Sequence, residues 1–100
     1  MVQIDVTDDL IHIHGHAERD VPVDGCNVPC GQVSILGLNL AQALTEITGQ
    51  PNKVLCLEKG NFQFDRKGLN TESGLLLRSF LLGLDFLSKA YPDKIRMTKL

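Results

Sequence analysis

The sequence has no strong excess of either charge. Ten basic and twelve acidic side chains leave the 100-residue chain with a formal net charge of −2. This balance supplies neither the positive field that draws proteins to nucleic acid nor a basic face for a membrane surface. We therefore expect neither a direct nucleic-acid partner nor a membrane partner.

Long apolar runs are also missing. No run approaches the ~20 apolar residues that a membrane span needs. The opening residues, MVQIDVTDDL, have neither the basic region nor the apolar run of a secretory signal. The chain shows no repeat and no low-complexity stretch. We expect one cytoplasmic domain over residues 1–100, small enough for oligomerisation to add to its stability.

Cysteine is scarce, and its number is odd. Cys26, Cys30 and Cys56 are the three in the chain. Without a secretory signal, three cysteines argue against a disulfide framework and raise the question of a reactive thiol or a metal site. Cys56 lies in a short apolar run, Lys-Val-Leu-Cys-Leu-Glu, which favours a buried small hydrophobic residue over a chemical role.

Hydrophobic spacing and turn signals predict an α/β protein of the α+β type, in two layers. The first part of the chain is predicted to form strands over 2–6 and 10–16, a loop over 17–29 and a helix from Cys30 to about Ile47. The second part is predicted to form a hairpin of 53–59 with 61–66, a helix from a cap at 70–73 to about Tyr91, and a possible strand over 94–98. The order ββαββα(β) indicates two helices packed on a mainly antiparallel sheet.

The second predicted helix carries two apolar stripes. They are Leu77, Phe80, Leu81, Leu84 and Leu87 on one face, and Leu75, Leu82 and Phe86 on another. A surface helix needs only one buried stripe. The second stripe therefore lies deep in the chain's own core or meets another subunit, and the small size of the domain favours the interface.

Cys30 is the best-placed thiol for chemistry. A free thiol has a pKa of about 8.5 and must ionise before it acts as a nucleophile. At the start of a helix, unpaired N–H groups and the positive end of the dipole stabilise the thiolate. His16 ends the strand that enters the same loop, which favours it as the general base. Gly31 imposes little bulk, and first-turn N–H groups suit an oxyanion.

These residues carry a family resemblance. Gly15-His16-Ala17, a loop, and Cys-x-x-Val-Ser-x-Leu at the head of a helix resemble the ribosomal-processing cysteine proteases (Prp, the YsxB-like proteins). The similarity runs nearly end to end and includes the tail from Tyr91 to Ile95. It implies a homodimeric α/β cysteine protease. Family members in some bacteria remove a short N-terminal extension from a large-subunit ribosomal protein, and phage relatives trim virion components.

The resemblance assigns roles to individual residues. His16 matches the catalytic histidine, Gly15 the glycine before it and Cys30 the catalytic cysteine. Ser34 matches a serine of the motif and shares a helix face with Cys30, where it either orients groups at the site or bonds back to its own helix.

Two positions depart from the family pattern. Asn27 stands where the family usually has an acidic residue, three before the cysteine, and Asp24 is the candidate replacement because this loop is about two residues longer. Gln32 is bulkier than the small residue expected there. These departures bear on the substrate pocket, and they leave the nucleophile and the base intact.

We therefore predict a cysteine endopeptidase that needs no cofactor and no metal. Its partner is a peptide segment, the N-terminus of a ribosomal protein or of a related phage structural protein, bound in a groove under the 17–29 loop. Three alternatives stay open. They are a zinc site made by two of His12, His14 and His16 with Cys26 and Cys30, a redox pair of Cys26 with Cys30, and a relative that binds peptide without cutting it.

Overall fold

The computed structural model describes residues 1–15, 28–58 and 60–99. Its elements are β1 (Val2–Val6), β2 (Leu10–His14), α1 (Val28–Ala43), the π-helical turn η1 (Leu44–Thr48), the 3₁₀ turn η2 (Pro51–Lys53), β3 (Val54–Glu58), β4 (Asn61–Asp65), α2 (Thr71–Ala90) and β5 (Ile95–Lys99). The predicted order of strands and helices, including the closing strand, is confirmed.

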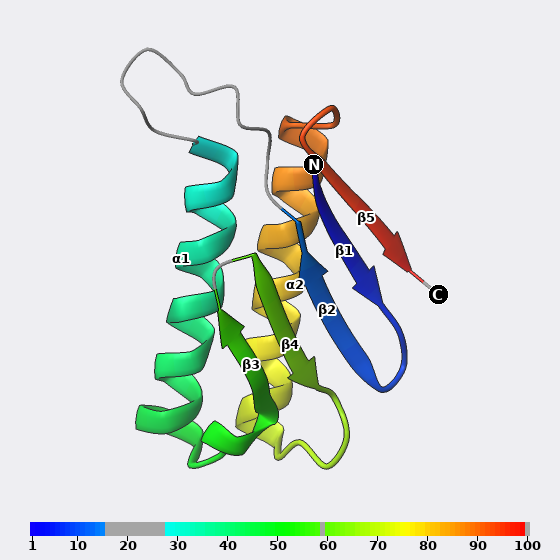
Figure 1. Ribbon diagram of the computed structural model, residues 1–100. Helices are drawn as coiled ribbons and strands as arrows, with labels where there is room; N and C mark the ends of the chain where they lie inside the picture. Colours follow the sequence, from blue (N-terminus) through cyan, green and yellow to red (C-terminus); the bar gives the residue numbers. More distant parts are fainter. Residues whose placement is uncertain (16–27, 59, 100) are drawn as a thin grey trace.

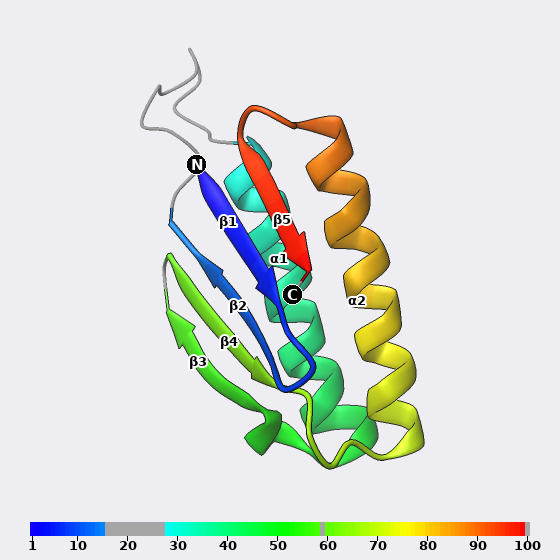
Figure 2. The ribbon, with the colours of Figure 1, turned by 90° about the vertical axis from the view of Figure 1, so that its right-hand side faces the viewer.

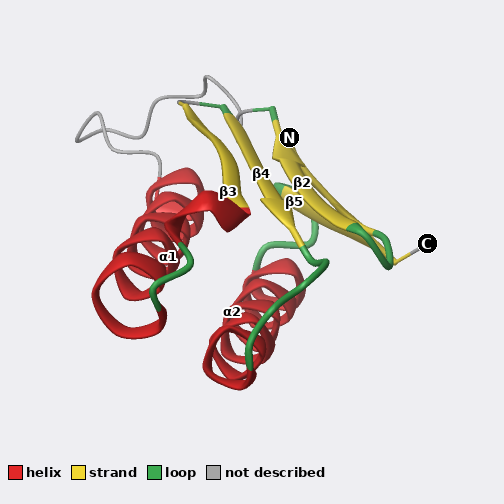
Figure 3. Cartoon of the chain, turned by 90° about the horizontal axis from the view of Figure 1, so that it is seen from below, coloured by secondary structure: helices red, strands yellow, loops and turns green. Residues whose placement is uncertain are grey.

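The five strands form one sheet in the order β3-β4-β2-β1-β5. Three neighbouring pairs are antiparallel, and β5 runs parallel to β1 at one edge (Figure 2). Both helices cover the same face of this sheet, and no other described element covers the opposite, open face (Figure 3). The predicted two-layer architecture with a mainly antiparallel sheet is thus confirmed.

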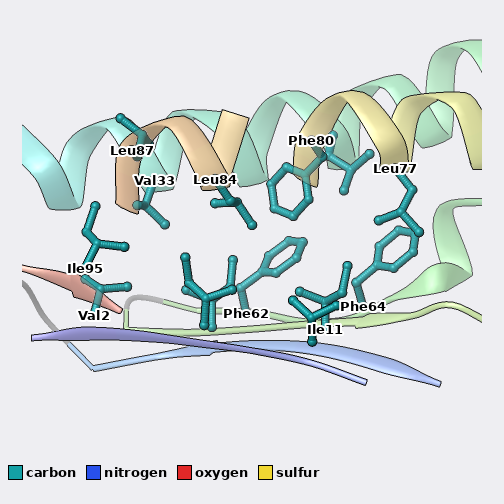
Figure 4. Close-up of a cluster of buried hydrophobic side chains, with 14 of the residues drawn as sticks. Val2, Ile11, Val33, Phe62, Phe64, Leu77, Phe80, Leu84, Leu87 and Ile95 are labelled. Atoms are coloured by element: carbon teal, nitrogen blue, oxygen red, sulfur yellow. The ribbon is translucent and has the colours of Figure 1, made fainter. Parts of the chain in front are cut away.

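The core lies between the sheet and the two helices (Figure 4). Strand residues alternate, so every second side chain points toward the helices. The buried apolar residues are Val2, Ile4, Val6, Ile11, Ile13, Phe62, Phe64 and Ile95 from the sheet, and Val33, Leu40, Leu44, Leu77, Phe80, Leu84 and Leu87 from the helical segments. The rings of Phe62 and Phe80 meet across the two layers with their centroids 5.6 Å apart.

Some predicted boundaries are wrong for identifiable reasons. β2 stops at His14 because Gly15 has a φ of +88°, a left-handed value that ends the extended chain. α1 begins at Val28 rather than Cys30, since Pro29 is tolerated in the first turn of a helix. Gly49 ends the segment as predicted. The π turn before it carries Ile47 off the buried face, and this side chain is 63% exposed.

α2 begins as predicted, with Asn70 as its N-cap. The Asn70 side-chain oxygen accepts the backbone N–H of Ser73 at 2.8 Å. The stripe that contains Leu84 is buried in the core, whereas Leu75, Leu82 and Phe86 are 57%, 72% and 70% exposed. Burial of both stripes in the chain's own core, the less favoured alternative, is therefore wrong.

Two further features bear on the sequence predictions. Cys56 is half-buried on the open face of the sheet rather than buried in the core, and its thiol approaches the Asn61 carbonyl oxygen at 3.7 Å. Among the residues described, no helix combines the length and the apolar character that a membrane crossing requires.

Candidate active site

Three parts of the chain meet at one end of the molecule. In Figure 1 the start of α1, the end of β2 and the turn between β3 and β4 all lie toward the upper end of the molecule, with the turn beside the middle of α1. The backbone N–H of Gly15, directly after β2, donates to the Gly60 carbonyl oxygen in the β3–β4 turn at 3.1 Å. This hydrogen bond ties the two hairpins together at the end where the sequence predicts the catalytic residues.

The structure describes only some of the predicted site residues. Gly15, Gly31 and Ser34 are described, and the backbone of Cys30 is the third residue of α1. His16, Asp24, Asn27 and Cys26 lie outside the described residues, and so does the predicted 17–29 loop as far as residue 27. The distance between Cys30 and His16 therefore stays a prediction.

A cavity of about 240 Å³ opens at this end of the molecule. Its walls come from the middle of α1, the start of β1, the end of β2, and the β3–β4 hairpin. The lining residues are Val2, Ile13, Gly15, Val33, Ser34, Gly37, Leu38, Leu57, Glu58, Gly60, Asn61 and Phe62. Two residues that the sequence singles out, Gly15 and Ser34, are thereby brought to one cavity from different elements.

Gly15 occupies a position that only glycine fits. Its φ of +88° disfavours any L side chain, and a Cβ there would stand 2.5 Å from the Met1 carbonyl oxygen. The chain can therefore turn sharply out of β2 while remaining against the start of β1. This local geometry holds the end of β2 against the start of β1.

Two glycines of α1 serve different purposes. A Cβ on Gly37 would stand 3.4 Å from Phe62 Cδ2, so the missing side chain lets the helix approach β4 closely. A Cβ on Gly31 would meet none of the described atoms within 4 Å. Open space beside Gly31 agrees with the predicted low steric bulk next to Cys30.

The start of α1 provides an electrostatic setting for an anion. The first N–H groups of a helix have no partner within it, and the helix dipole makes this end positive. No acidic side chain lies in the first turn of α1 to oppose that field. Gln32 Oε1, one residue beyond Gly31, is buried without a hydrogen-bond partner among the described residues.

The wall formed by the β3–β4 hairpin was missed by sequence reasoning. Leu57 and Glu58 end β3, Asn61 begins β4, and all three line the cavity. Their signal was the Gly60-Asn61 turn, which predicts a hairpin but not where the hairpin packs. Glu58 is the one carboxylate among the described residues that line the cavity.

The two histidines of β2 face away from this cavity. His12 and His14 alternate with the buried residues Ile11 and Ile13, as predicted, so they lie on the open face of the sheet. Their rings stack with centroids 4.5 Å apart. Cys26 and His16 lie outside the described residues, so the structure does not test the alternative sites that include them.

Comparison with known proteins points to one family. Residues 1–96 match the family described as cysteine protease Prp. No curated protein matches the chain.

Solved structures give a consistent likeness. The chain is similar to an essential ribosomal processing protease Prp from S. aureus in complex with a covalently linked product peptide, with 21% identity, 100% of each chain covered and a TM-score of 0.79. The same S. aureus protease with a substrate peptide gives 19% identity, 100% of each chain covered and a TM-score of 0.76. SMU.848 from Streptococcus mutans gives 19% identity, coverage of 99% of this chain and 91% of that chain, and a TM-score of 0.70. At these identities the likeness shows a shared fold.

Proposed function

Because this chain belongs to the cysteine protease Prp family, and is thus a cysteine protease, we propose that Cys30 is its nucleophile and His16 its general base. The observation that carries this assignment is the position of Cys30 in the first turn of α1, at the end of the molecule where the cavity opens. Cys56, by contrast, belongs to β3 on the open sheet face.

The sequence positions of Cys30 and His16 relative to the residues that line the cavity support the dyad. Cys30 precedes Val33, Ser34 and Gly37, three cavity residues of α1, by three, four and seven positions. This spacing repeats on one face of a helix. His16 directly follows Gly15, which lines the same cavity from the other wall. The two reactive groups thus belong to segments that border one cavity.

The reaction follows from these roles. His16 takes the thiol proton, and the Cys30 sulfur attacks the scissile carbonyl carbon. N–H groups of the first turn of α1, near Gly31, stabilise the oxyanion. His16 gives its proton to the leaving amine, and a water molecule, deprotonated by His16, then releases the acyl group from sulfur. No metal or cofactor takes part in these steps.

Other residues support the dyad. Gly15 sets the backbone from which His16 follows, and Ser34, exposed at the cavity one helical turn after Cys30, orients groups in it. Asp24 or Asn27 takes the place of the family's loop acid.

The substrate is an extended peptide segment. A cavity of about 240 Å³ is smaller than the ~300–1,000 Å³ pockets that enclose drug-sized ligands, which suits one or two side chains of a longer peptide. The S. aureus relative is described as a ribosomal processing protease. We assign to this chain the removal of a short N-terminal peptide from a ribosomal protein, or from a related phage structural protein, in the cytoplasm.

The active form is a homodimer of one domain, residues 1–100. The exposed stripe of Leu75, Leu82 and Phe86 on α2 supports this assignment. Side chains of this size gain about 1.5–3 kcal/mol each when fully buried. A partner copy that covers the stripe would remove them from water.

The test is cleavage of N-terminal peptides from ribosomal proteins of the source organism and from the structural proteins of its phages. The unmodified chain should cut a member of this set, and Cys30→Ala and His16→Ala should each abolish cleavage while the circular dichroism spectrum stays unchanged. Cys26→Ala is the matched control and should retain activity. Cleavage by Cys30→Ala, or loss of cleavage in Cys26→Ala alone, would show that the nucleophile is misassigned.

A further inference from the structure

The open face of the sheet gathers three side chains of the kinds that bind transition metals. Asp5 on β1 stands directly opposite His12 on β2, and His14 lies two residues further along β2 on the same face. One potential ligand atom from each of the three lies within 4.8 Å of the other two. The cluster lies on the open face of the sheet, whereas the cavity lies on the helix side of the same strands, and Asn61 borders both.

Hydrogen bonds hold this cluster together. His14 Nε2 is 3.0 Å from Asp5 Oδ2, and Asn61 Oδ1 is 3.0 Å from His12 Nε2. Gln3 Nε2 donates to Asp5 Oδ1 at 2.9 Å, so Oδ2 is the carboxylate oxygen turned to the imidazole. The hydrogen bonds with His14 and Gln3 lower the pKa of Asp5 below its ordinary value, and the bond with His14 has the larger effect.

We propose that Asp5, His12 and His14 form a binding site for a divalent transition-metal ion of the zinc type. Two imidazole nitrogens and one carboxylate oxygen suit zinc and its neighbours rather than magnesium or calcium, which prefer oxygen ligands. Three protein ligands leave one position of a tetrahedral ion for water. This proposal differs from the sequence prediction that the protein needs no metal. It also differs from the alternative zinc site of the sequence analysis, because it uses no cysteine.

The ligand atoms need to move by about an ångström or less on average to accept the ion. Ligands at ~2.1 Å from a tetrahedral zinc ion stand ~3.4 Å apart, so the nitrogen of His14 and the oxygen of Asp5, now 3.0 Å apart, would separate slightly. The ligand atom of His12, within 4.8 Å of the other two, would move toward them. The ion would replace the hydrogen between His14 and Asp5. The side chains of His14 and Asp5 are 42% and 33% exposed, so a hydrated ion reaches them from solvent without opening the core.

The first test is titration of the tag-free, reduced full-length chain with ZnCl₂, followed by calorimetry, and with CoCl₂, followed by absorption. We expect one ion per chain and cobalt bands without thiolate-to-cobalt charge transfer. The double variant Cys26→Ala/Cys30→Ala and the variant His16→Ala should bind equally well. No binding, thiolate bands, or loss of binding in either of these variants would overturn the proposal.

Matched variants locate the ligands. His12→Gln, His14→Gln and Asp5→Asn should each weaken zinc binding at least ~10-fold, the loss typical even of residues that only orient metal ligands. Asp65→Asn changes another strand carboxylate, one paired with Lys53, and should leave the affinity unchanged. Equal affinity in all four variants would contradict the site. Zinc should also shift the imidazole NMR signals of His12 and His14 in the unmodified chain, and unmoved signals would contradict the site without any variant.

Discussion

Gly15 and Met1 are packed so closely that no side chain fits between them. A Cβ on Gly15 would lie 2.5 Å from the Met1 carbonyl oxygen, and the φ of Gly15 is +88°. The start of β1 and the exit of β2 are therefore held together at the residue that precedes His16. Any change that separates them moves the chain from which the proposed general base follows.

Replacement of Gly15 by alanine should destabilise the protein. The left-handed backbone alone costs a non-glycine residue about 1–2 kcal/mol, and the contact with Met1 adds to this. Urea unfolding should show a loss of about 2 kcal/mol or more, with reduced peptide cleavage. Gly31→Ala is the stability control, because a Cβ there meets none of the described atoms. The Gly31→Ala variant should unfold at the same urea concentration as the unmodified chain or slightly above it. Equal unfolding midpoints for Gly15→Ala and the unmodified chain would contradict the account of this turn.

Variants of two leucines in β3 distinguish a role in peptide binding from the general effect of a charge placed on the surface. Leu57 lines the cavity and is 46% exposed, whereas Leu55 on the same strand is 56% exposed and does not line it. Leu57→Lys should raise the KM for a cleavable peptide about tenfold or more, since an apolar contact of this size contributes about 1.5–3 kcal/mol. Leu55→Lys should leave the KM unchanged. Similar KM values for the two variants would mean that the cavity does not bind the substrate.

The exposed stripe of α2 makes a prediction about assembly. Leu82 is 72% exposed in the single chain, and burial of an unpaired charge at a subunit interface is strongly unfavourable. Leu82→Asp should therefore convert a dimer to a monomer in sedimentation equilibrium. Ile47 is 63% exposed outside α2, so Ile47→Asp serves as the control and should remain dimeric. A dimeric Leu82→Asp would place the interface elsewhere.

Asp65 predicts a defined dependence of stability on pH. The backbone N–H of Lys67 donates to its carboxylate at 2.9 Å, and the ammonium of Lys53 lies 3.7 Å away. These contacts hold the pKa of Asp65 below its ordinary value of 3.8. A carboxyl group whose pKa is lowered by folding stabilises the native state above the unfolded pKa, and this contribution is lost as the pH falls through the folded value.

Asp65→Asn should therefore be less stable than the unmodified chain at pH 7, and the difference should shrink as the pH falls below 3.8. Urea unfolding of both proteins at pH 7 and pH 3 measures it. A difference that is the same at both values would mean that the ionised carboxylate does not stabilise the fold.

The sequence predicted the helices and strands well where the signals are local. Asn70 as the α2 cap and Gly49 as the end of the first helical segment follow from side-chain and backbone preferences of single residues. The π turn that exposes Ile47 could not be predicted, because it depends on how the end of the helical segment packs. The parallel pairing of β5 with β1 is likewise a tertiary contact between distant segments.

The candidate site was predicted unevenly for the same reason. The motif around Gly15 and Cys30 is contiguous enough to recognise in a sequence. Leu57, Glu58 and Asn61 reach the cavity only because β3 and β4 pack beside β2 and α1. The cluster of Asp5 with His12 and His14 needs the register of β1 against β2, which alternation within one strand does not fix.

The most direct test of the central claim is the order in which the three cysteines react with iodoacetamide at neutral pH, mapped by peptide mass spectrometry. We predict that Cys30 is modified first in the folded protein, that His16→Ala slows its modification, and that Cys26 and Cys56 lag behind. In denaturant the three should react at similar rates, which shows that the preference comes from the fold. Faster modification of Cys26 or Cys56 than of Cys30 in the folded, active protein would contradict the assignment of Cys30 as the nucleophile.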